Sequence, residues 1–423
     1  MSEHPDLEKL PLEIDGIPVR ETIREIFCKP ENGTPDNISK AGCLALAKQS
    51  RSAYFVNMAQ TSGFESALSI SRACIVWNAW RQSFPSLGGV DVIQGFDNKA
   101  DFSSNDFASD TNSDSGPVTT SFEGFSFGHQ ASFRSAKFAH VNFRRVNFGI
   151  HACFEDAHFQ EAADFDDANF GSSVSFVNTR FESALSFVGC QFLGVVDFST
   201  CDSLSQKFSG HVCFDKAIFK GPVSFNGRHF ANATSFKSAH FAVAPTFHGC
   251  ELHQDTSFEG AIFPEATGSE DAARAYRTLK LAFSKQQAIR EEQRFFRLEM
   301  AEETLLETGL KRWLFWAYNT FSDYGFSVMR PFLLLTATWL VFAQIYGAHA
   351  SPQSLCVLGQ TDCRLQGEWF TFSLQQALPL PGFEQLDSTI KGVSVGWLFL
   401  HKTLSLIALF LIGLALRNLF KLK

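Results

Sequence analysis

The feature that most constrains the fold of this chain is the regular return of phenylalanine between residues 133 and 263. The spacing mostly alternates between five and six residues, so each stretch of 11 residues carries two aromatic positions. This period matches neither the helical repeat of about 3.6 residues nor the strand repeat of about 2. It predicts a repeat architecture in which short segments stack on one another. The uninterrupted run that we take as the repeat core is Phe154, Phe159, Phe165, Phe170, Phe176, Phe181, Phe187, Phe192 and Phe198.

A second position of the repeat is also apolar. The residue two places before each phenylalanine is usually Ala, Val or Cys, as with Ala157 before Phe159 and Cys190 before Phe192. Alternate side chains of an extended segment share a face, so we expect both positions to point inward. The remaining positions are mostly polar, which suits a solvated outer surface. Cysteines at the inward positions then act as reduced, small apolar residues.

The composition indicates what fills this core and what the surface does not do. Phe accounts for 47 of the 423 residues and Tyr for only 5, so the aromatic chosen is the one without a hydroxyl to satisfy. The net charge is -8, and residues 122–263 carry 14 acidic and 10 basic side chains. This mild, mixed charge does not favour binding to nucleic acid, and we expect no nucleic-acid partner.

Units of the form A-x-F-x-x, such as AHFQE and ANFGS, resemble those of pentapeptide-repeat proteins. The resemblance implies a right-handed quadrilateral β-helix in which each unit forms one side, with about 22 residues per coil for this alternating spacing. The expected fold class is therefore mainly β, with an α-helical cap, a long linker helix and two transmembrane helices in addition. Soluble members of the family inhibit gyrase by mimicking DNA with an acidic rod. The mixed charge here makes a DNA-mimic gyrase inhibitor the weakest alternative.

The cytoplasmic part divides into three predicted regions. Residues 1–90 have apolar side chains at helical spacing and are predicted to form a helical N-terminal cap. Residues 91–265 form the β-helix, with a polar insertion at 108–121, and 269–312 is predicted as one long linker helix. The first residues lack an apolar run after a basic start, so we expect no secretory signal and a cytoplasmic location for this part.

Residues 313–423 are predicted to form a membrane domain. Two apolar segments, at about 325–348 and 393–416, are long enough to span a bilayer. Trp313 and Trp316 precede the first, as is typical of a membrane interface. Basic residues flank the outer ends of both segments, which predicts cytoplasmic N- and C-termini in a bacterial inner membrane, with lipid as a partner.

The loop at 350–392 would then face the periplasm. Cys356 and Cys363 lie in it, with six residues between them. A disulfide between them is compatible with that oxidising compartment, and two free thiols are the alternative, because spacing alone does not establish geometry.

The same loop contains the segment EWFTFSLQQALPLPGF. Residues 369–377 are predicted to form a short amphipathic helix, and the prolines that follow favour extended backbone. This order of elements is the layout of two-span pore-loop channels, which have a span, a re-entrant half-helix, an irregular segment and a second span. The alternative is a periplasmic hairpin that never enters the membrane. The pore-loop candidates are Gln375, Gln376, Leu378, Pro379, Leu380, Pro381 and Gly382.

Two ionisable residues, His401 and Lys402, lie inside the second apolar segment. At that depth such residues usually face a cavity or a partner, whereas a Lys402 close to the interface would extend its ammonium to the headgroups. No catalytic motif is present, and we expect neither an enzyme nor a cofactor. His248, Cys250 and His253 are close in sequence, but the repeat would direct them to different sides, so we expect no metal site.

The C-terminal half resembles that of phenylalanine-rich pentapeptide-repeat membrane proteins, in its long charged helix, its Tyr324-Gly325-Phe326-Ser327 motif before the first span and its leucine-proline loop. This resemblance implies an ion-channel-like domain under a cytoplasmic repeat domain. Two spans cannot enclose a pore, so a homo-oligomer is required, with a tetramer as the analogy-based prediction. The hypothesis is a channel opened by a cytoplasmic protein or ligand, in a stress response or anti-phage defence. The alternative is a membrane-anchored scaffold that presents the β-helix to a protein partner.

Overall fold

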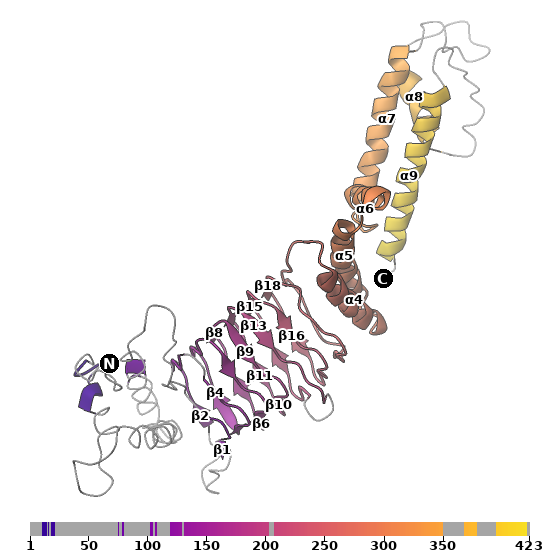
Figure 1. Cartoon of the computed structure of the whole chain (residues 1–423). Helices are drawn as coiled ribbons and strands as arrows, with labels where there is room; N and C mark the ends of the chain where they lie inside the picture. The colour runs from indigo at the N-terminus through magenta and orange to yellow at the C-terminus, as the bar shows by residue number, and fades with distance from the viewer. Residues whose placement is uncertain are drawn as a thin grey trace, which may run out of the picture. The chain divides into compact units, whose positions relative to one another are not determined.

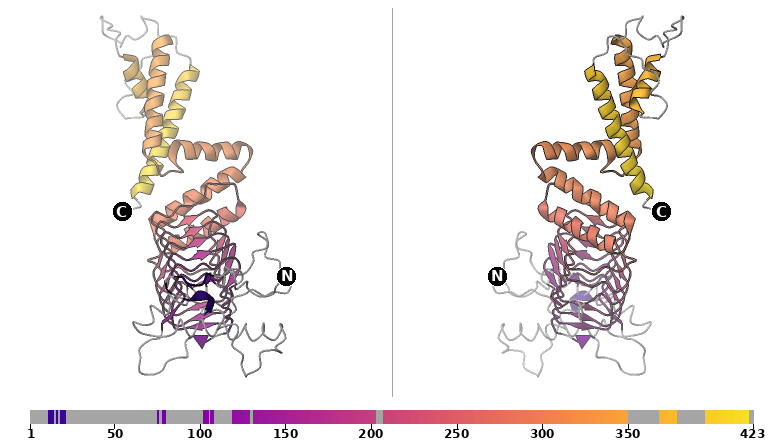
Figure 2. Two further views of the ribbon diagram at one scale, coloured as in Figure 1. Left: turned by 90° about the vertical axis from the view of Figure 1, so that its left-hand side faces the viewer. Right: turned by 90° about the vertical axis from the view of Figure 1, so that its right-hand side faces the viewer.

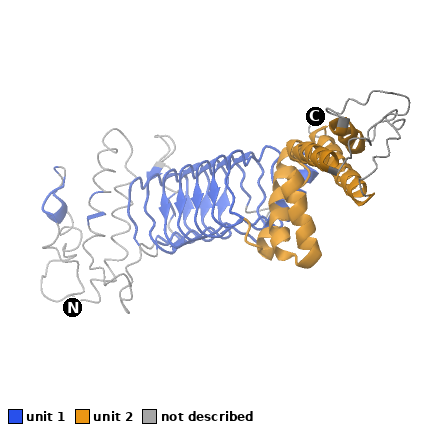
Figure 3. Ribbon diagram, turned by 90° about the horizontal axis from the view of Figure 1, so that it is seen from above, with its two compact units in different colours: residues 1–265, 274–288 blue, residues 266–273, 289–423 orange. Residues whose placement is uncertain are grey.

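The computed structural model describes residues 119–128, 131–202, 207–349, 368–378 and 395–420, together with isolated residues between 11 and 21, at 75 and 78–79, and between 102 and 107. The chain forms two compact units, residues 1–265 with 274–288 and residues 266–273 with 289–423 (Figure 3). The predicted N-terminal cap lies largely outside the described residues, and the cysteine pair of the 350–392 loop lies entirely outside them.

The first unit contains a solenoid of short parallel strands that stack in four sheets, one for each side of the coil (Figure 1). The first sheet holds β1 (Asp106–Phe107), β3 (Lys137–Phe138), β6 (His158–Phe159) and β10 (Arg180–Phe181). The second holds β2 (Thr119–Ser121), β4 (His140–Asn142), β7 (Ala163–Asp164), β11 (Leu185–Ser186), β14 (Val212–Cys213) and β17 (Thr234–Ser235). The third holds β8 (Asn169–Phe170), β12 (Gln191–Phe192), β15 (Ile218–Phe219) and β18 (His240–Phe241). The fourth holds β5 (Ala152–Cys153), β9 (Ser173–Ser175), β13 (Val195–Asp197) and β16 (Val223–Ser224).

The strand register confirms the predicted coil length. Val141 pairs with Ala163, and Ala163 pairs with Leu185, each 22 positions further along the chain. One coil is longer, because Leu185 pairs with Val212, 27 positions away. The extra residues fall near 203–206, which lie outside the described part. The predicted insertion at 108–121 is wrong at its end, since Thr119–Ser121 pair with β4 as a strand.

The alternation of five and six residues has a backbone cause. Each five-residue side turns through a residue with positive φ two places after its phenylalanine, as at Asp156 (φ 57), Asp167 (φ 58) and Asn178 (φ 57). Asp, Asn and Gly tolerate this conformation better than other residues. The N–H of the next residue then closes the turn, as Ala157 does to the carbonyl of Phe154 at 3.1 Å. The turn two residues after these phenylalanines therefore helps to decide which residue types occupy the outer positions.

Phenylalanine rings stacked along the solenoid axis form the core. The rings of Phe154 and Phe176 are 4.8 Å apart and inclined by 7°, and those of Phe176 and Phe198 are 4.7 Å apart and inclined by 5°. Within a coil the contacts are edge-to-face, as between Phe154 and Phe165 at 87°. Every phenylalanine of the predicted repeat core is at most 2% exposed, which confirms that set. The stack also extends to Phe102, whose ring lies 5.0 Å from that of Phe133.

Arg228 is a charged exception inside this core. It occupies an inward position, two places before Phe230, and is 0% exposed. Its guanidinium donates to the carbonyls of Phe176, Thr179 and Phe198, which belong to the two preceding coils. Burial lowers the pKa of Arg228 to about 9, so the side chain remains charged at neutral pH. This arginine bridges the coils on either side of the longer coil.

Helix α4 (Glu270–Lys285) closes the C-terminal end of the solenoid. Phe283 packs edge-on against Phe258, at 6.0 Å and 81°, and Tyr276 packs against Phe263 at 6.0 Å. The amide of Gln286 donates to the carbonyl of Leu252. A covered end is what a repeat stack requires, because its last coil has no neighbour.

The prediction of one helix over 269–312 is wrong. The chain forms α4, then α5 (Ile289–Leu306), and then α6 (Gly309–Ser322). Gln287 lies between α4 and α5 with φ 58, and the Ala288 N–H bonds to the carbonyl of Phe283, so the first helix ends while Phe283 stays on the solenoid. Near the start of α4, the buried carboxylate of Glu302 accepts the N–H groups of Thr267, Gly268 and Ser269 at 2.7 to 3.0 Å.

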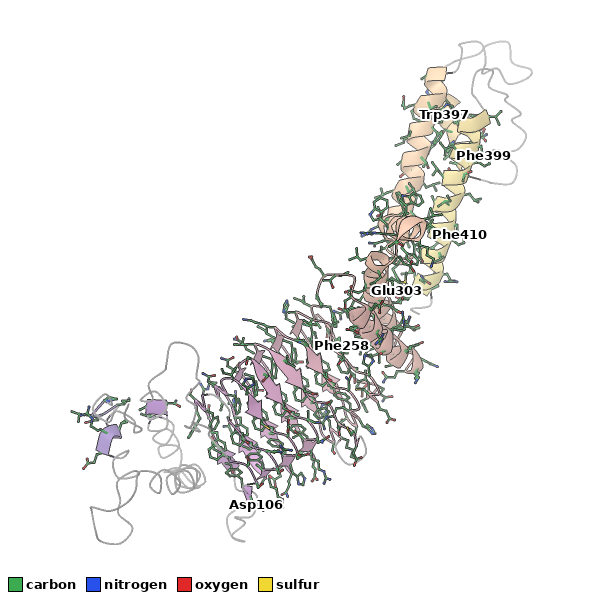
Figure 4. The ribbon with its side chains drawn as sticks, in the orientation of Figure 1. Asp106, Phe258, Glu303, Trp397, Phe399 and Phe410 are labelled. Carbon is green, nitrogen blue, oxygen red and sulfur yellow. The ribbon has the colours of Figure 1, made fainter. Side chains whose placement is uncertain are left out.

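The second unit continues with α7 (Met329–His349), α8 (Glu368–Ala377) and α9 (Val395–Phe420), which we call the three-helix domain. Helices α7 and α9 are long and apolar enough to cross a membrane. The first begins at 329, later than the predicted 325, because the residues before it form a turn. Large apolar side chains remain uncovered along both, such as Phe399 (72% exposed) and Phe410 (66%) of α9 (Figure 4). Such surfaces suit a lipid environment better than water.

Candidate functional site

Helix α8 lies alongside the C-terminal half of α7 (Figure 1). The Ser373 hydroxyl donates to the carbonyl of Trp339 at 2.8 Å, and the Trp339 indole N–H donates to the carbonyl of Phe370 at 2.9 Å. At the other end of the contact, the Trp369 ring covers Gly347, where an added Cβ would lie 3.5 Å from the indole. Gly347 and Trp339 are eight residues apart, or about 12 Å along a helix. The short helix therefore descends beside α7 to its middle.

A polar cluster lies where α7, α8 and α9 meet. His401 of α9 is 0% exposed, and its Nδ1 lies 3.0 Å from the hydroxyl of Tyr346. The imidazole stacks on Phe342, with ring centroids 4.4 Å apart and an angle of 2°. Phe372 of α8 packs edge-on against Tyr346 at 5.3 Å. One contact set therefore joins all three helices around a histidine.

The same face of α9 carries a second buried polar group. Ser405 follows His401 by one helical turn and is 1% exposed. Among the described residues, neither His401 Nε2 nor Ser405 Oγ has a hydrogen-bond partner. Lys402, by contrast, is exposed, since the next residue of a helix points about 100° away. Of the two ionisable residues predicted to lie within the second span, His401 is thus buried between helices and Lys402 is exposed.

The pore-loop candidates are only partly described. Gln375 and Gln376 lie half-buried in the last turn of α8, and Leu378 follows directly after the helix. The residues from Pro379 to Gly382 lie outside the described part. The predicted short helix at 369–377 is confirmed as α8, since only its first residue differs.

The Tyr324-Gly325-Phe326-Ser327 motif forms a turn that joins four helices. Asp323, Tyr324 and Gly325 all have positive φ, at 52°, 53° and 85°. Arg297 of α5 pairs with Asp323 at 3.3 Å, and Asn418 of α9 donates to the Gly325 carbonyl at 2.9 Å. The segment lies between α6 and α7, so the end of α6, the start of α7, the end of α9 and the side of α5 meet here.

Tyr324 anchors this turn. Its side chain is 4% exposed, and its hydroxyl lies 2.8 Å from Thr304 Oγ1 of α5. Burial raises the pKa of Tyr324, so the phenol keeps its proton near neutral pH. An added Cβ at Gly325 would lie 2.7 Å from both Leu414 and the Tyr318 hydroxyl. The sequence pointed to the motif, but the partners on α5 and α9 carry no local signal.

The histidines and cysteine near residue 250 have separate partners. His248 Nδ1 lies 3.0 Å from the Thr278 hydroxyl, and Cys250 Sγ lies 2.9 Å from the carbonyl of Phe225. Burial raises the pKa of Cys250 to about 12, so its thiol stays protonated. His253 pairs with Asp255. Among the residues that the structure describes, no group of three or more His, Cys, Asp or Glu could hold a metal ion.

Comparison with known proteins supports the repeat region and reaches no further. Residues 154–202 and 214–262 match the family described as pentapeptide repeats, nine copies. The interruption falls on the longer coil between Leu185 and Val212. No curated protein and no solved structure matches the chain. The repeat match and the four-sided solenoid together support a pentapeptide-repeat protein, to which two helices of membrane-spanning length are attached.

Proposed function

We propose that this protein is an oligomeric ion channel or pore of the bacterial inner membrane, gated by its cytoplasmic pentapeptide-repeat domain. The observation that carries the proposal is the position of α8 beside the C-terminal half of α7, held by Ser373 and Trp339. If α7 spans a bilayer, a helix at this level lies within the membrane. A short helix that descends partway and is followed by prolines matches the re-entrant element of a pore-loop channel.

The proposal requires several copies of the chain. Two spans and one half-helix cannot surround a pore, so we propose a homo-oligomer, with a tetramer as the arrangement suggested by analogy. The uncovered apolar side chains of α9, including Phe399 and Phe410, would contact lipid or neighbouring copies. The half-buried amides of Gln375 and Gln376 would then lie where the α8 helices converge.

The turn at Tyr324 supplies a route for gating. It bonds to Arg297 and Thr304 of α5 and to Asn418 at the end of α9. A displacement of α5 would therefore act directly on the cytoplasmic ends of both spans. We propose that a cytoplasmic protein or ligand recognised by the repeat domain causes this displacement, and that opening depolarises the cell during stress or phage infection.

The charges on the solenoid support this function over DNA mimicry. Acidic and basic side chains alternate across neighbouring coils, as in the pairs Arg144–Asp164 and Lys237–Glu259, at 3.6 and 3.1 Å. A surface of neutralised pairs offers no row of negative charges resembling duplex phosphates. The remaining alternative is a membrane-anchored scaffold without transport.

Ion flux from liposomes containing the purified full-length protein tests the proposal. We expect flux above that of empty liposomes, and a lower flux for Ser373→Val, which removes the hydroxyl that holds α8 to α7. Thr336→Val is the matched control, because the Thr336 hydroxyl bonds only within its own helix. A protein that inserts but conducts no ions under any condition would refute the channel and leave the scaffold.

Labelling separates the two alternatives further. Cysteines introduced at Gln375 and Gln376, in a background whose accessible native cysteines are serine, should react slowly with a bulky impermeant reagent if α8 enters the membrane. Rapid, uniform reaction would mean a hairpin on the membrane surface.

A further inference from the structure

Helix α6 has a broad uncovered apolar face although it is packed on its other side. Leu310 is 72% exposed, Trp313 58%, Leu314 51% and Trp316 52%. On the packed side, Tyr318 contacts Tyr324 at 5.8 Å, and Tyr324 bonds to α5. At about 100° per residue, Trp313 and Trp316 lie roughly 140–160° around the helix from Tyr318. The tryptophans therefore point away from the residues that attach α6 to α5.

The charge of α6 is entirely basic. Its sequence, GLKRWLFWAYNTFS, contains Lys311 and Arg312 and no acidic residue. Lys311 pairs with Glu307, two residues before the helix, at 3.6 Å, but its side chain is still 73% exposed. Arg330, at the start of α7, donates to the carbonyl of Asn319 at 2.9 Å and so stays beside the end of α6. Arg417, in the last turn of α9, adds a further exposed cation at the same end of the three-helix domain. Basic side chains next to exposed tryptophans favour anionic headgroups.

The direction of α6 agrees with this composition. Figure 2 shows α6 running crosswise to α7 within the second unit. If α7 crosses a bilayer, α6 lies along its surface, at the end where α7 begins and α9 ends. Tryptophan and leucine can then enter the boundary between headgroups and acyl chains, while the basic side chains remain in water.

We infer that α6 is a membrane-surface helix that binds anionic phospholipid headgroups of the cytoplasmic leaflet. The inference rests on the membrane location in the proposed function, but it does not require a conducting pore. Because α6 leads into the turn at Tyr324, lipid held by α6 would act at the point where α5 meets the spans. The lipid composition of the leaflet would then directly influence the turn at Tyr324.

The depth of α6 is tested with the full-length protein in nanodiscs. A fluorophore is attached at Leu310→Cys, with the accessible native cysteines replaced by serine, and doxyl-labelled lipid serves as the quencher. We expect strong quenching at Leu310→Cys and much weaker quenching at Arg290→Cys, the exposed control position in the first turn of α5 within the same unit. A Leu310 label that aqueous iodide quenches instead, or that neither quencher reaches because a second copy covers it, overturns the inference.

The headgroup preference is tested by thermal stabilisation in detergent. Added phosphatidylglycerol should stabilise the protein more than phosphatidylcholine does. Its apparent affinity should be about 25-fold weaker in Lys311→Gln/Arg312→Gln, since each of the two basic side chains near an anionic surface contributes about fivefold. Lys216→Gln/Lys220→Gln on the solenoid removes the same charge and should change nothing. Equal effects of the two lipids, or of the two double variants, would contradict the inference.

Ion flux, measured separately, distinguishes this inference from the channel proposal. Quenching with the expected lipid preference but no flux defeats the channel and leaves the surface helix. Flux without quenching defeats the surface helix and leaves the channel.

Discussion

The solenoid and the three-helix domain both pack through aromatic side chains, but they specify the neighbours of those side chains in different ways. In the solenoid, each ring stacks on the equivalent ring of the next coil, as Phe154 does on Phe176. In the three-helix domain, each contact is individual: His401 on Phe342, Trp339 with Phe370. The contacts of a periodic sequence can therefore be predicted from its repeat, whereas the contacts of an aperiodic sequence depend on how its helices pack in the tertiary structure.

Both regions also contain buried polar groups, and some of these groups have no hydrogen-bond partner among the described residues. Within the solenoid, Arg228 donates to three carbonyls of the two preceding coils, whereas the Oδ1 atoms of Asn169 and Asn178 have no hydrogen-bond partner among the described residues. In the three-helix domain, His401 and Ser405 each keep one buried polar atom without a partner among the described residues. Each such atom calls for an explanation, which can be strain, a bound water or ion, or a function. An unpartnered polar atom alone therefore does not mark the candidate site, which is defined instead by the contacts of His401 and Phe372 with Tyr346.

The largest effect is expected from removing one ring of the stack. Phe176→Ala deletes a fully buried side chain that contacts rings above, below and beside it, and should lower the free energy of unfolding by about 3–5 kcal/mol. Denaturant unfolding followed by circular dichroism measures this. Lys216→Ala, on the outer face of the same solenoid, should change stability by no more than about 0.5 kcal/mol. Similar losses for both would mean that the stack does not hold the solenoid together.

Arg228 should come next. Arg228→Met keeps much of the volume but leaves the carbonyls of Phe176, Thr179 and Phe198 without its donors, and we expect a loss of about 3 kcal/mol. Arg228→Lys should not restore stability, because one ammonium cannot reproduce the planar fork. The same unfolding measurement applies. A Met variant as stable as the parent would show that the cost of burying the charge cancels its hydrogen bonds.

An intermediate effect on stability is expected at the turn that contains Tyr324 and Gly325. Gly325→Ala combines a positive φ of 85° with a Cβ 2.7 Å from Leu414, and should cost about 2 kcal/mol. Gly309→Ala has a similar φ of 62° but open space, so it should cost about 1 kcal/mol. Thermal unfolding in detergent gives the ranking, and ion flux reports the change in gating. Equal costs would mean that the packing around Gly325 adds nothing to its strain.

The smallest effect concerns the polar cluster. Tyr346→Phe keeps the ring that packs on Phe372 but removes the hydroxyl that bonds His401, and should cost about 1 kcal/mol. Thr403→Val, whose hydroxyl bonds only to Phe399 of its own helix, is the control. Thermal unfolding in detergent compares the two. A Tyr346→Phe variant no less stable than the control would indicate that stacking alone positions His401.

The amino-acid sequence by itself determined the solenoid, because its period repeats the same inward positions in every coil and one register satisfies them all. Length and apolar composition likewise located the two long helices to within a few residues. Local patterns failed where a distant contact decides the outcome. The linker breaks after Lys285 because Phe283 and Gln286 are held on the last coils. Arg228 lies in the core because carbonyls two coils away bind it. Only the tertiary structure set the level of α8 beside α7 and joined Tyr324 to α5 and α9, since these contacts link residues 20 to 93 positions apart and no local preference encodes them.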